Sequence, residues 1–349
     1  MKKAKFQKAA IAATVLLMAT AQVWAQQAAN DITGDWQLSV DVNNVKMPAI
    51  LSLSKDAGGK LAGKWIGFGV SDLKDVNYAE GKLSFKQTVR ARDAESTSNF
   101  TGTIKDDKLS GTLSGERGIS NVEGVRIKPQ AAAVGNWEIK TKMGEKDIAA
   151  TLTVKADKDG KLAAQWQDGN NISQITDFNF IQNKLTFSRK ETIDGNEKTS
   201  NYELTVKGDT LAGTVKSKDG EGQAEGKLIG AALVGKWELT VTSERGTRMQ
   251  ILQVNRDLSG LYGAIPIDKI NLQDSQVSFK FVMQRREQTV ENEFKGKLEG
   301  EKLTGDLASG FGGGSRKVDG KKLGAVPAGA PTPAPAEAAP AGAADANKK

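Results

Sequence analysis

Short stretches in which apolar and polar residues alternate run through most of the chain. In residues 36–42, every second residue from Trp36 to Val42 is apolar and the residues between them are polar. A period of two is typical of a half-buried antiparallel β-strand. The 38 glycines suit tight turns between such strands, and no long apolar helical stripe is present. The sequence therefore predicts an all-β fold of many short strands.

One tripeptide pattern, G-x-W, opens three similar stretches of the chain. Its copies are Gly34-Asp35-Trp36, Gly135-Asn136-Trp137 and Gly235-Lys236-Trp237. The tryptophans lie 101 and 100 residues apart, and the landmarks that follow them keep the same order. This spacing predicts three tandem copies of one small antiparallel β-barrel or sandwich. We expect these domains to span residues 34–128, 135–230 and 235–324.

An acidic turn follows the second strand of each copy. Asp56 precedes Gly59 in the first copy, and Asp157 precedes Gly160 in the second. An aspartate followed by glycine is typical of a hairpin turn, because the acid accepts backbone hydrogen bonds and glycine adopts positive φ. A calcium loop needs several oxygen ligands, whereas each turn offers one or two carboxylates. We therefore expect hairpins and no metal site.

The two ends of the chain differ in composition from the repeats. Residues 1–25 combine basic residues, an apolar run and the small-residue pattern Val23-Trp24-Ala25, which together predict an export signal cleaved after Ala25. An uncleaved membrane anchor is the alternative, but the apolar run is short for a membrane span. Residues 325–349 are rich in Pro, Ala and Gly and predict a disordered tail. The expected location is therefore periplasmic or secreted, with no integral membrane segment in the mature chain.

Charge and composition exclude several classes of function. The formal net charge is +7, and four of the lysines (Lys2, Lys3, Lys5 and Lys8) lie in the predicted export signal, which leaves +3. Basic and acidic residues alternate along the strands, so a mixed-charge surface is expected rather than a nucleic-acid groove. The chain contains no Cys and no His, which removes disulfides, the commonest metal ligand and the commonest general base. We expect no catalytic residues, no cofactor and no enzymatic activity.

Four residues are candidates for ligand binding. Trp65 and Trp166 lie on the strand that returns from the acidic turn, where each is either a core residue or a stacking floor at a barrel mouth. Arg248 and Gln250 share a strand face with Leu252 by alternation, which would point two polar groups inward. A shifted register that buries Met249 and Ile251 instead is the alternative.

A polar strand follows in each copy. In the second copy it carries Arg189, Lys190 and Glu191. We expect this strand to be an edge or a solvent-facing strand, where charge discourages aggregation, with an anion site as the alternative.

The G-x-W pattern, together with a basic residue on the last strand, resembles the lipocalin-like (calycin) barrels. In that family the Trp seals the closed end of the barrel and an Arg lies across its ring. The resemblance implies three barrel-closing pairs, Trp36 with Arg126, Trp137 with Lys227 and Trp237 with Lys321. The units also look like short exported bacterial β-modules of unassigned function. A cation over an indole contributes about 0.5–2 kcal/mol.

The resemblance implies a function in binding rather than catalysis. Three modules in one chain would give avidity for an apolar small molecule or a lipid. The alternative is a cell-surface scaffold or a polysaccharide-binding module. An enzyme would have to rely on carboxylates, Lys or Tyr alone, and no set of such residues stands out.

Overall fold

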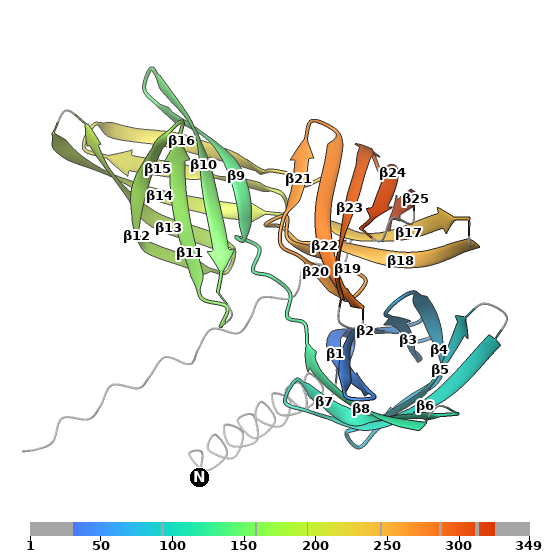
Figure 1. The fold of residues 1–349 in the computed structure, drawn as a ribbon. Coiled ribbons are helices and arrows are strands. Elements are labelled where there is room, and N and C mark those ends of the chain that lie inside the picture. The colour runs from blue at the N-terminus through green and yellow to red at the C-terminus, as the bar shows by residue number, and fades with distance from the viewer. Residues whose placement is uncertain are drawn as a thin grey trace, which may run out of the picture. The chain divides into compact units, whose positions relative to one another are not determined.

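The computed structural model describes residues 31–324 except 92–93, 117, 158, 194, 245, 286–287 and 311–313. Every helix or strand assigned in these residues is a β-strand, which confirms the all-β class. The strands form three antiparallel sheets in tandem along the chain (Figure 1). The predicted export signal and the predicted tail lie outside the described residues.

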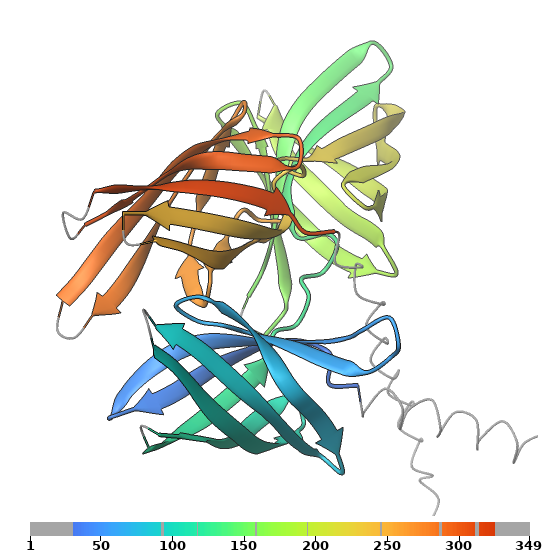
Figure 2. The ribbon, with the colours of Figure 1, turned by 90° about the vertical axis from the view of Figure 1, so that its right-hand side faces the viewer.

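The first sheet is a closed barrel of eight strands. Each strand pairs with the next, and β8 returns to pair with β1 (Figure 2, blue to teal). The strands are β1 (Gly34–Val42), β2 (Val45–Lys55), β3 (Leu61–Ile66), β4 (Val70–Ala79), β5 (Lys82–Ala91), β6 (Ala94–Lys105), β7 (Lys108–Gly115) and β8 (Gly118–Arg126). Closure removes both sheet edges, so the expected barrel, and not a sandwich, is what forms here.

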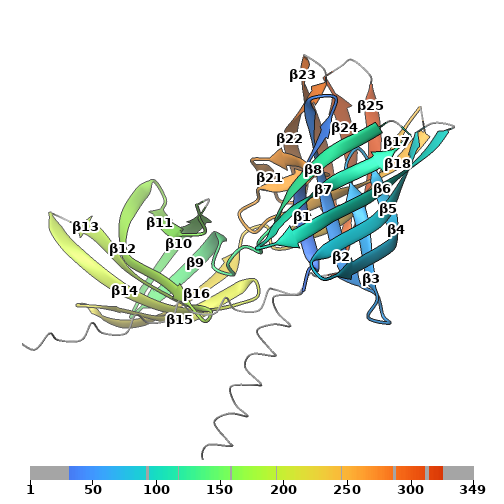
Figure 3. The same ribbon diagram turned by 90° about the horizontal axis from the view of Figure 1, so that it is seen from below.

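The second sheet repeats this topology, and β16 closes it on β9 (Figure 3). Its strands are β9 (Gly135–Met143), β10 (Lys146–Ala156), β11 (Leu162–Asp168), β12 (Asn171–Ile181), β13 (Lys184–Ile193), β14 (Asn196–Lys207), β15 (Thr210–Ser217) and β16 (Gly220–Leu228). A β-bulge interrupts the β12–β13 pairing between Thr176 and Asn179, at the place where the first barrel has one between Lys74 and Asn77. The two barrels therefore share strand order and bulge position.

The third sheet is not closed. Its nine strands run in the order β20-β19-β18-β17-β25-β24-β23-β22-β21, which leaves β20 and β21 at the two edges. The strands are β17 (Gly235–Ser243), β18 (Gly246–Val254), β19 (Gly260–Tyr262), β20 (Ile265–Ile267), β21 (Ile270–Gln273), β22 (Gln276–Arg285), β23 (Gln288–Glu299), β24 (Lys302–Ser309) and β25 (Ser315–Lys322). The two edge strands β20 and β21 are separated in the chain by residues 268–269, so the third sheet is open between them.

The described residues divide into two compact units. One unit holds the first barrel up to Lys128 together with residues 236–253 and 260–323 of the third copy. The other holds residues 129–235, which form the second barrel, together with residues 254–259, which end β18 and form the turn after it. A short segment of the third copy therefore belongs to the second unit.

The same aromatic pair lies at the centre of each sheet. The rings stack with centroids 4.6 Å apart for Phe85 and Phe100, 4.7 Å for Phe187 and Tyr202, and 4.9 Å for Phe279 and Phe294. The three repeat-opening tryptophans have no exposed surface, and the alternate residues of their strands complete each core. Burial of one face of every strand follows from the period-two pattern.

Candidate functional site

In the first barrel, Arg126 lies over Trp36. The guanidinium carbon lies 4.5 Å from the centroid of the indole ring. Its nitrogens donate to three oxygens: Nη1 to the Thr33 carbonyl at 2.6 Å, Nη2 to the Asp31 carbonyl at 2.8 Å and Nε to Oδ1 of Asp107 at 2.8 Å. Charge-assisted bonds of this kind hold the cation over the ring.

The other two implied pairs are displaced by one residue. The strand register places Arg126 opposite Trp36, Leu228 opposite Trp137 and Lys322 opposite Trp237. Lys227 and Lys321 are opposite Glu138 and Glu238 instead, and both lysines are exposed. Because successive side chains of a strand point to opposite faces, a displacement of one residue moves a lysine from the ring to the solvent.

In the third copy, the cation over the closing tryptophan is therefore Lys322. Its Nζ lies 5.6 Å from the centroid of the Trp237 ring. In the second copy, Leu228 occupies the place of Arg126, and the cation comes from Arg256, whose guanidinium carbon lies 5.3 Å from the centroid of the Trp137 ring. Alignment of the last strands could have found Lys322 but not Arg256, which belongs to the following repeat.

Trp65 and Trp166 both lie in hydrophobic cores. Trp65 is 7% exposed and packs near Phe85, with centroids 6.2 Å apart. Trp166 is fully buried, 5.0 Å from Tyr202 and 6.0 Å from Phe187 between ring centroids. The structure therefore places both indoles in core packing, which was one of the two expectations for them.

Gln250 is buried, as alternation with Leu252 predicts, but its polar atoms are already bonded. Nε2 donates to the Gly67 carbonyl at 3.0 Å, and Oε1 accepts from the Ile251 amide at 3.0 Å. Met249 is 41% exposed, whereas Ile251 is buried in a small cluster with Ile50 and Ile66. Gln250 thus joins the third copy to the first within one compact unit, and it offers few atoms to a ligand.

Arg248 lies with a second arginine at one end of the third sheet. Arg316 of β25 is half-buried and donates from Nη2 to Oδ1 of the buried Asn292 at 3.4 Å. Burial lowers the pKa of Arg316, and the nearby Arg248 charge lowers it further. Neither arginine forms an ion pair with a carboxylate in the part of the chain that the structure describes. The two guanidinium charges therefore repel each other, and neither has a carboxylate partner among the described residues.

Tyr262 completes this group of residues. The side chain is 3% exposed and stacks on Phe281 with ring centroids 4.4 Å apart. Burial raises the pKa of its phenol, while the charges of Arg248 and Arg316 act in the opposite direction. The buried hydroxyl has no hydrogen-bond partner with regular geometry among the described residues. The site offers two cations, a phenol and an aromatic wall, and we call Arg248, Arg316, Tyr262 and Asn292 the arginine pair site.

The sequence predicted only Arg248 of this site. Arg316 follows from alternation back along β25 through Gly320 and Val318. Its pairing partner Leu307 corresponds to Leu113 and Val215, whose own partners are Ser120 and Gly222. Only the third copy carries a charge at this position.

The second barrel holds a different polar group inside. Arg189 is 2% exposed, lies 5.2 Å from the Trp166 ring centroid and forms an ion pair with Glu191. The expectation that this strand faces solvent is wrong for Arg189, because alternation from Phe187 turns its side chain inward. Four buried polar atoms of this barrel lack partners: Thr141 Oγ1, Trp166 Nε1, Arg189 Nε and Tyr202 Oη. The charges here are balanced internally, unlike those of the arginine pair site.

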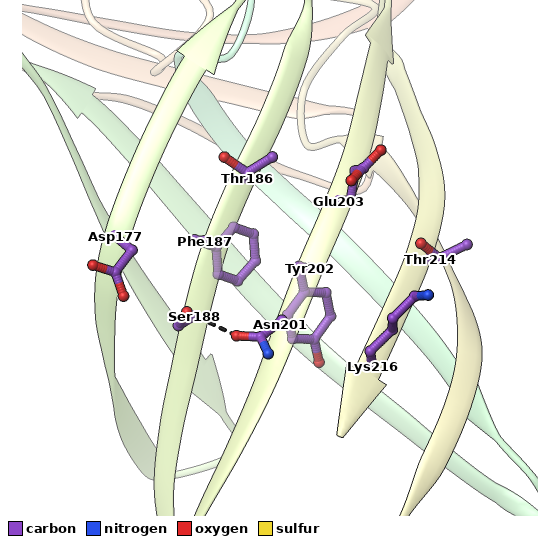
Figure 4. Close-up of a pocket in the computed structure, with 9 residues that line it drawn as sticks. All are labelled: Asp177, Thr186, Phe187, Ser188, Asn201, Tyr202, Glu203, Thr214 and Lys216. Carbon is purple, nitrogen blue, oxygen red and sulfur yellow. Dashed lines mark hydrogen bonds between the residues drawn. The ribbon is translucent and has the colours of Figure 1, made fainter. Parts of the chain in front are cut away.

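A polar groove of about 290 Å³ crosses the outer face of the second barrel over β12 to β15 (Figure 4). Its lining residues are Asp177, Thr186, Phe187, Ser188, Asn201, Tyr202, Glu203, Thr214 and Lys216. Ser188 Oγ donates to Asn201 Oδ1 at 2.8 Å on the floor of this groove. A second pocket of about 250 Å³ lies in the other unit, between β2 to β4 and residues Lys236, Ile251 and Leu323.

Two kinds of feature are absent from the described residues. No cluster of three or more His, Cys, Asp or Glu side chains could hold a metal ion. No helix there is long and apolar enough to span a bilayer.

Comparison with known proteins gives no family assignment. No protein-family model and no curated protein matches the sequence significantly. Three solved structures show distant similarity: a provisionally assigned outer membrane protein from Bacteroides fragilis, a DUF3598-family protein of unknown function from Nostoc punctiforme, and transferrin binding protein B from Neisseria meningitidis. Their identities are 10%, 10% and 11%, and their TM-scores are 0.23, 0.19 and 0.19. They cover 84%, 84% and 80% of this chain and 99%, 96% and 66% of their own. Scores this low support no argument about function.

Proposed function

We propose that this chain is an exported, non-catalytic binding protein of three lipocalin-like modules, and that it takes a small amphiphilic anion at the arginine pair site. The proposal rests on Arg248 of β18 and Arg316 of β25, which are both half-buried, interact as like charges and have no carboxylate partner among the described residues. Two like charges near each other in a partly buried place raise the free energy of the empty site. A bound anion would remove this repulsion.

The chemistry of the side chains defines the class of ligand. Guanidinium groups present planar sets of donors that match carboxylate and phosphate oxygens. Tyr262 and Phe281 stack on each other, and an apolar body would pack against this aromatic pair. An apolar small molecule or lipid with a carboxylate or phosphate head satisfies both halves of the site.

Binding of decanoate to the full-length mature chain, followed by isothermal titration calorimetry, tests this proposal. Decanol serves as the uncharged probe of the same length. The variants Arg248→Met and Arg316→Ser install the residues that the first copy has at these places, Met47 and Ser120, so both are compatible with the fold. Lys321→Gln removes one exposed charge elsewhere and is the matched control.

We expect each arginine variant to weaken decanoate binding by about tenfold or more and to leave decanol binding unchanged. Lys321→Gln should change decanoate affinity by less than about twofold. Absence of decanoate binding by the intact chain, or equal binding by all variants, would contradict the proposal.

A second candidate function is polysaccharide binding, which the polar groove of the second barrel favours. Its hydroxyl, amide and carboxylate side chains are groups that hydrogen-bond to sugars. Retention of the protein on insoluble glycans, lost on replacement of Asn201 and Glu203 by Ala, would support it. Equal retention of the variant would show that the groove is not the site.

A further inference from the structure

The turn after β18 differs from the corresponding turns of the other two copies. Residues 56–60 and the described residues of 157–161 are exposed, whereas Asn255 to Ser259 are all half-buried. The third-copy turn contacts the second barrel within one compact unit. The turn of the third copy is therefore packed against another part of the protein, whereas the corresponding turns of the other copies are exposed to solvent.

That partner is a socket around Trp137. Arg256 Nε donates to the Val134 carbonyl at 3.2 Å, Nη1 to Oδ1 of Asp209 at 3.1 Å and Nη2 to the Gly208 carbonyl at 3.0 Å. The guanidinium group lies over the indole ring. Each donor of the guanidinium group named here has an oxygen acceptor, as each named donor of Arg126 has in the first barrel.

Two of the three acceptors are equivalent in the two sockets. Val134 and Thr33 each precede the first glycine of a G-x-W motif, and their carbonyls accept from Arg256 and Arg126 respectively. Asp209 and Asp107 lie in the turns between the sixth and seventh strands and supply the carboxylates. The two guanidinium groups are oriented differently in their sockets. Nε donates to the carboxylate in Arg126 and to the carbonyl in Arg256.

Among the described residues, the second barrel places no cation of its own over Trp137. Leu228 stands opposite Trp137 and is 4% exposed. We infer that the following repeat completes the second barrel. The Trp137 end of this barrel is a socket for an arginine side chain, and the turn after β18 supplies that side chain as Arg256.

Two further contacts show that this turn is fitted to the barrel. A Cβ on Gly135, whose φ is +137°, would come within 3.0 Å of the Arg256 carbonyl oxygen, so only glycine allows this approach. Leu258 adopts a φ of 60°, which is unusual for a leucine, and its side chain lies against Gly230. A strained leucine persists where its surroundings compensate for the strain.

The test uses the full-length chain and amide hydrogen exchange. Arg256→Gln removes the cation and should speed exchange of the β9 and β16 amides by about threefold or more, while β1 and β8 stay unchanged. Leu228→Arg supplies a cation from the position of Arg126, so the double variant Leu228→Arg with Arg256→Gln should regain the lost protection. Leu228→Met in the Arg256→Gln background controls for the change of side chain and should not regain it.

Arg126→Gln is the matched control in the first barrel, and it should speed exchange in β1 and β8 only. Unchanged exchange of β9 in Arg256→Gln would overturn the inference. A loss of protection that Leu228→Arg does not repair, or that Leu228→Met repairs equally, would also overturn it, because the cation would then not be the missing group.

Discussion

Asp35 and Lys236 occupy the same place in the repeat motif and form an ion pair with each other. Their Oδ2 and Nζ atoms are 2.6 Å apart, and the side chains are 14% and 20% exposed. Each is the middle residue of a G-x-W motif. Their ion pair joins the first copy to the third inside one compact unit. The second copy has Asn136 at this place, and its Oδ1 accepts from Thr153 Oγ1 instead. One motif position thus carries an acid, an amide and a base.

Replacement of either partner of this ion pair should destabilise the protein. Asp35→Asn or Lys236→Gln should each lower the free energy of unfolding by about 1.5–3 kcal/mol, because a partly buried charge loses its partner. The double variant should cost less than the sum of the two. Urea unfolding measures all three, with the exposed pair Lys64 and Asp72 as the control of near-zero effect. Strict additivity would show that the two residues do not interact.

Gln250→Ala should destabilise the unit that holds the first and third copies. The first and second copies have Ala49 and Ala150 at the corresponding position, so alanine is compatible with the strand. The loss arises because the Gly67 carbonyl loses its donor, which costs about 1–3 kcal/mol. Chemical unfolding should show this loss, and the exposed Met249→Ala should change stability by less than about 0.5 kcal/mol. Equal effects of the two variants would refute the role of the hydrogen bond.

Tyr262 should make the stability of the protein fall at alkaline pH. Burial raises the pKa of its phenol above the unfolded value, so the folded state holds this proton more tightly. The resulting stabilisation is complete below the unfolded pKa of about 10 and is lost as the pH rises through the folded pKa. Urea midpoints compared across this range for the native chain and Tyr262→Phe measure the effect. The variant should lose less stability, and parallel curves would contradict the prediction.

The ion pair between Arg189 and Glu191 in the second barrel should be replaceable by the two uncharged residues that the first barrel has at these positions. Arg189→Gln, which introduces the residue found at Gln87, leaves Glu191 without its partner and should cost about 1–3 kcal/mol. Adding Glu191→Val, the residue found at Val89, should restore most of the loss, because no unpaired charge remains. Thermal unfolding distinguishes the two variants. A double variant less stable than the single one would show that the pair contributes net stability.

The repeat and the strand faces were predictable because they depend on local pattern. Trp36, Trp137 and Trp237 are buried as the alternation in their strands requires, and Gln250 faces the same way as Leu252. A side chain's face depends on its own strand and its neighbours two residues away. The closing cation was predicted correctly for the first copy alone. In the third copy the last strand carries adjacent lysines at 321 and 322, which allow two registers, and in the second copy the cation, Arg256, lies outside the last strand.

The sequence by itself determined that this protein is three copies of one β-fold, because a period of two and a repeated G-x-W require only neighbouring residues. Only the tertiary structure decided that the Arg256 guanidinium lies over the Trp137 ring, that Arg316 lies near Arg248 and that Asp35 forms an ion pair with Lys236. These pairs join residues far apart in the chain, and their distances follow from strand pairing and from the packing of copies, which no local pattern encodes.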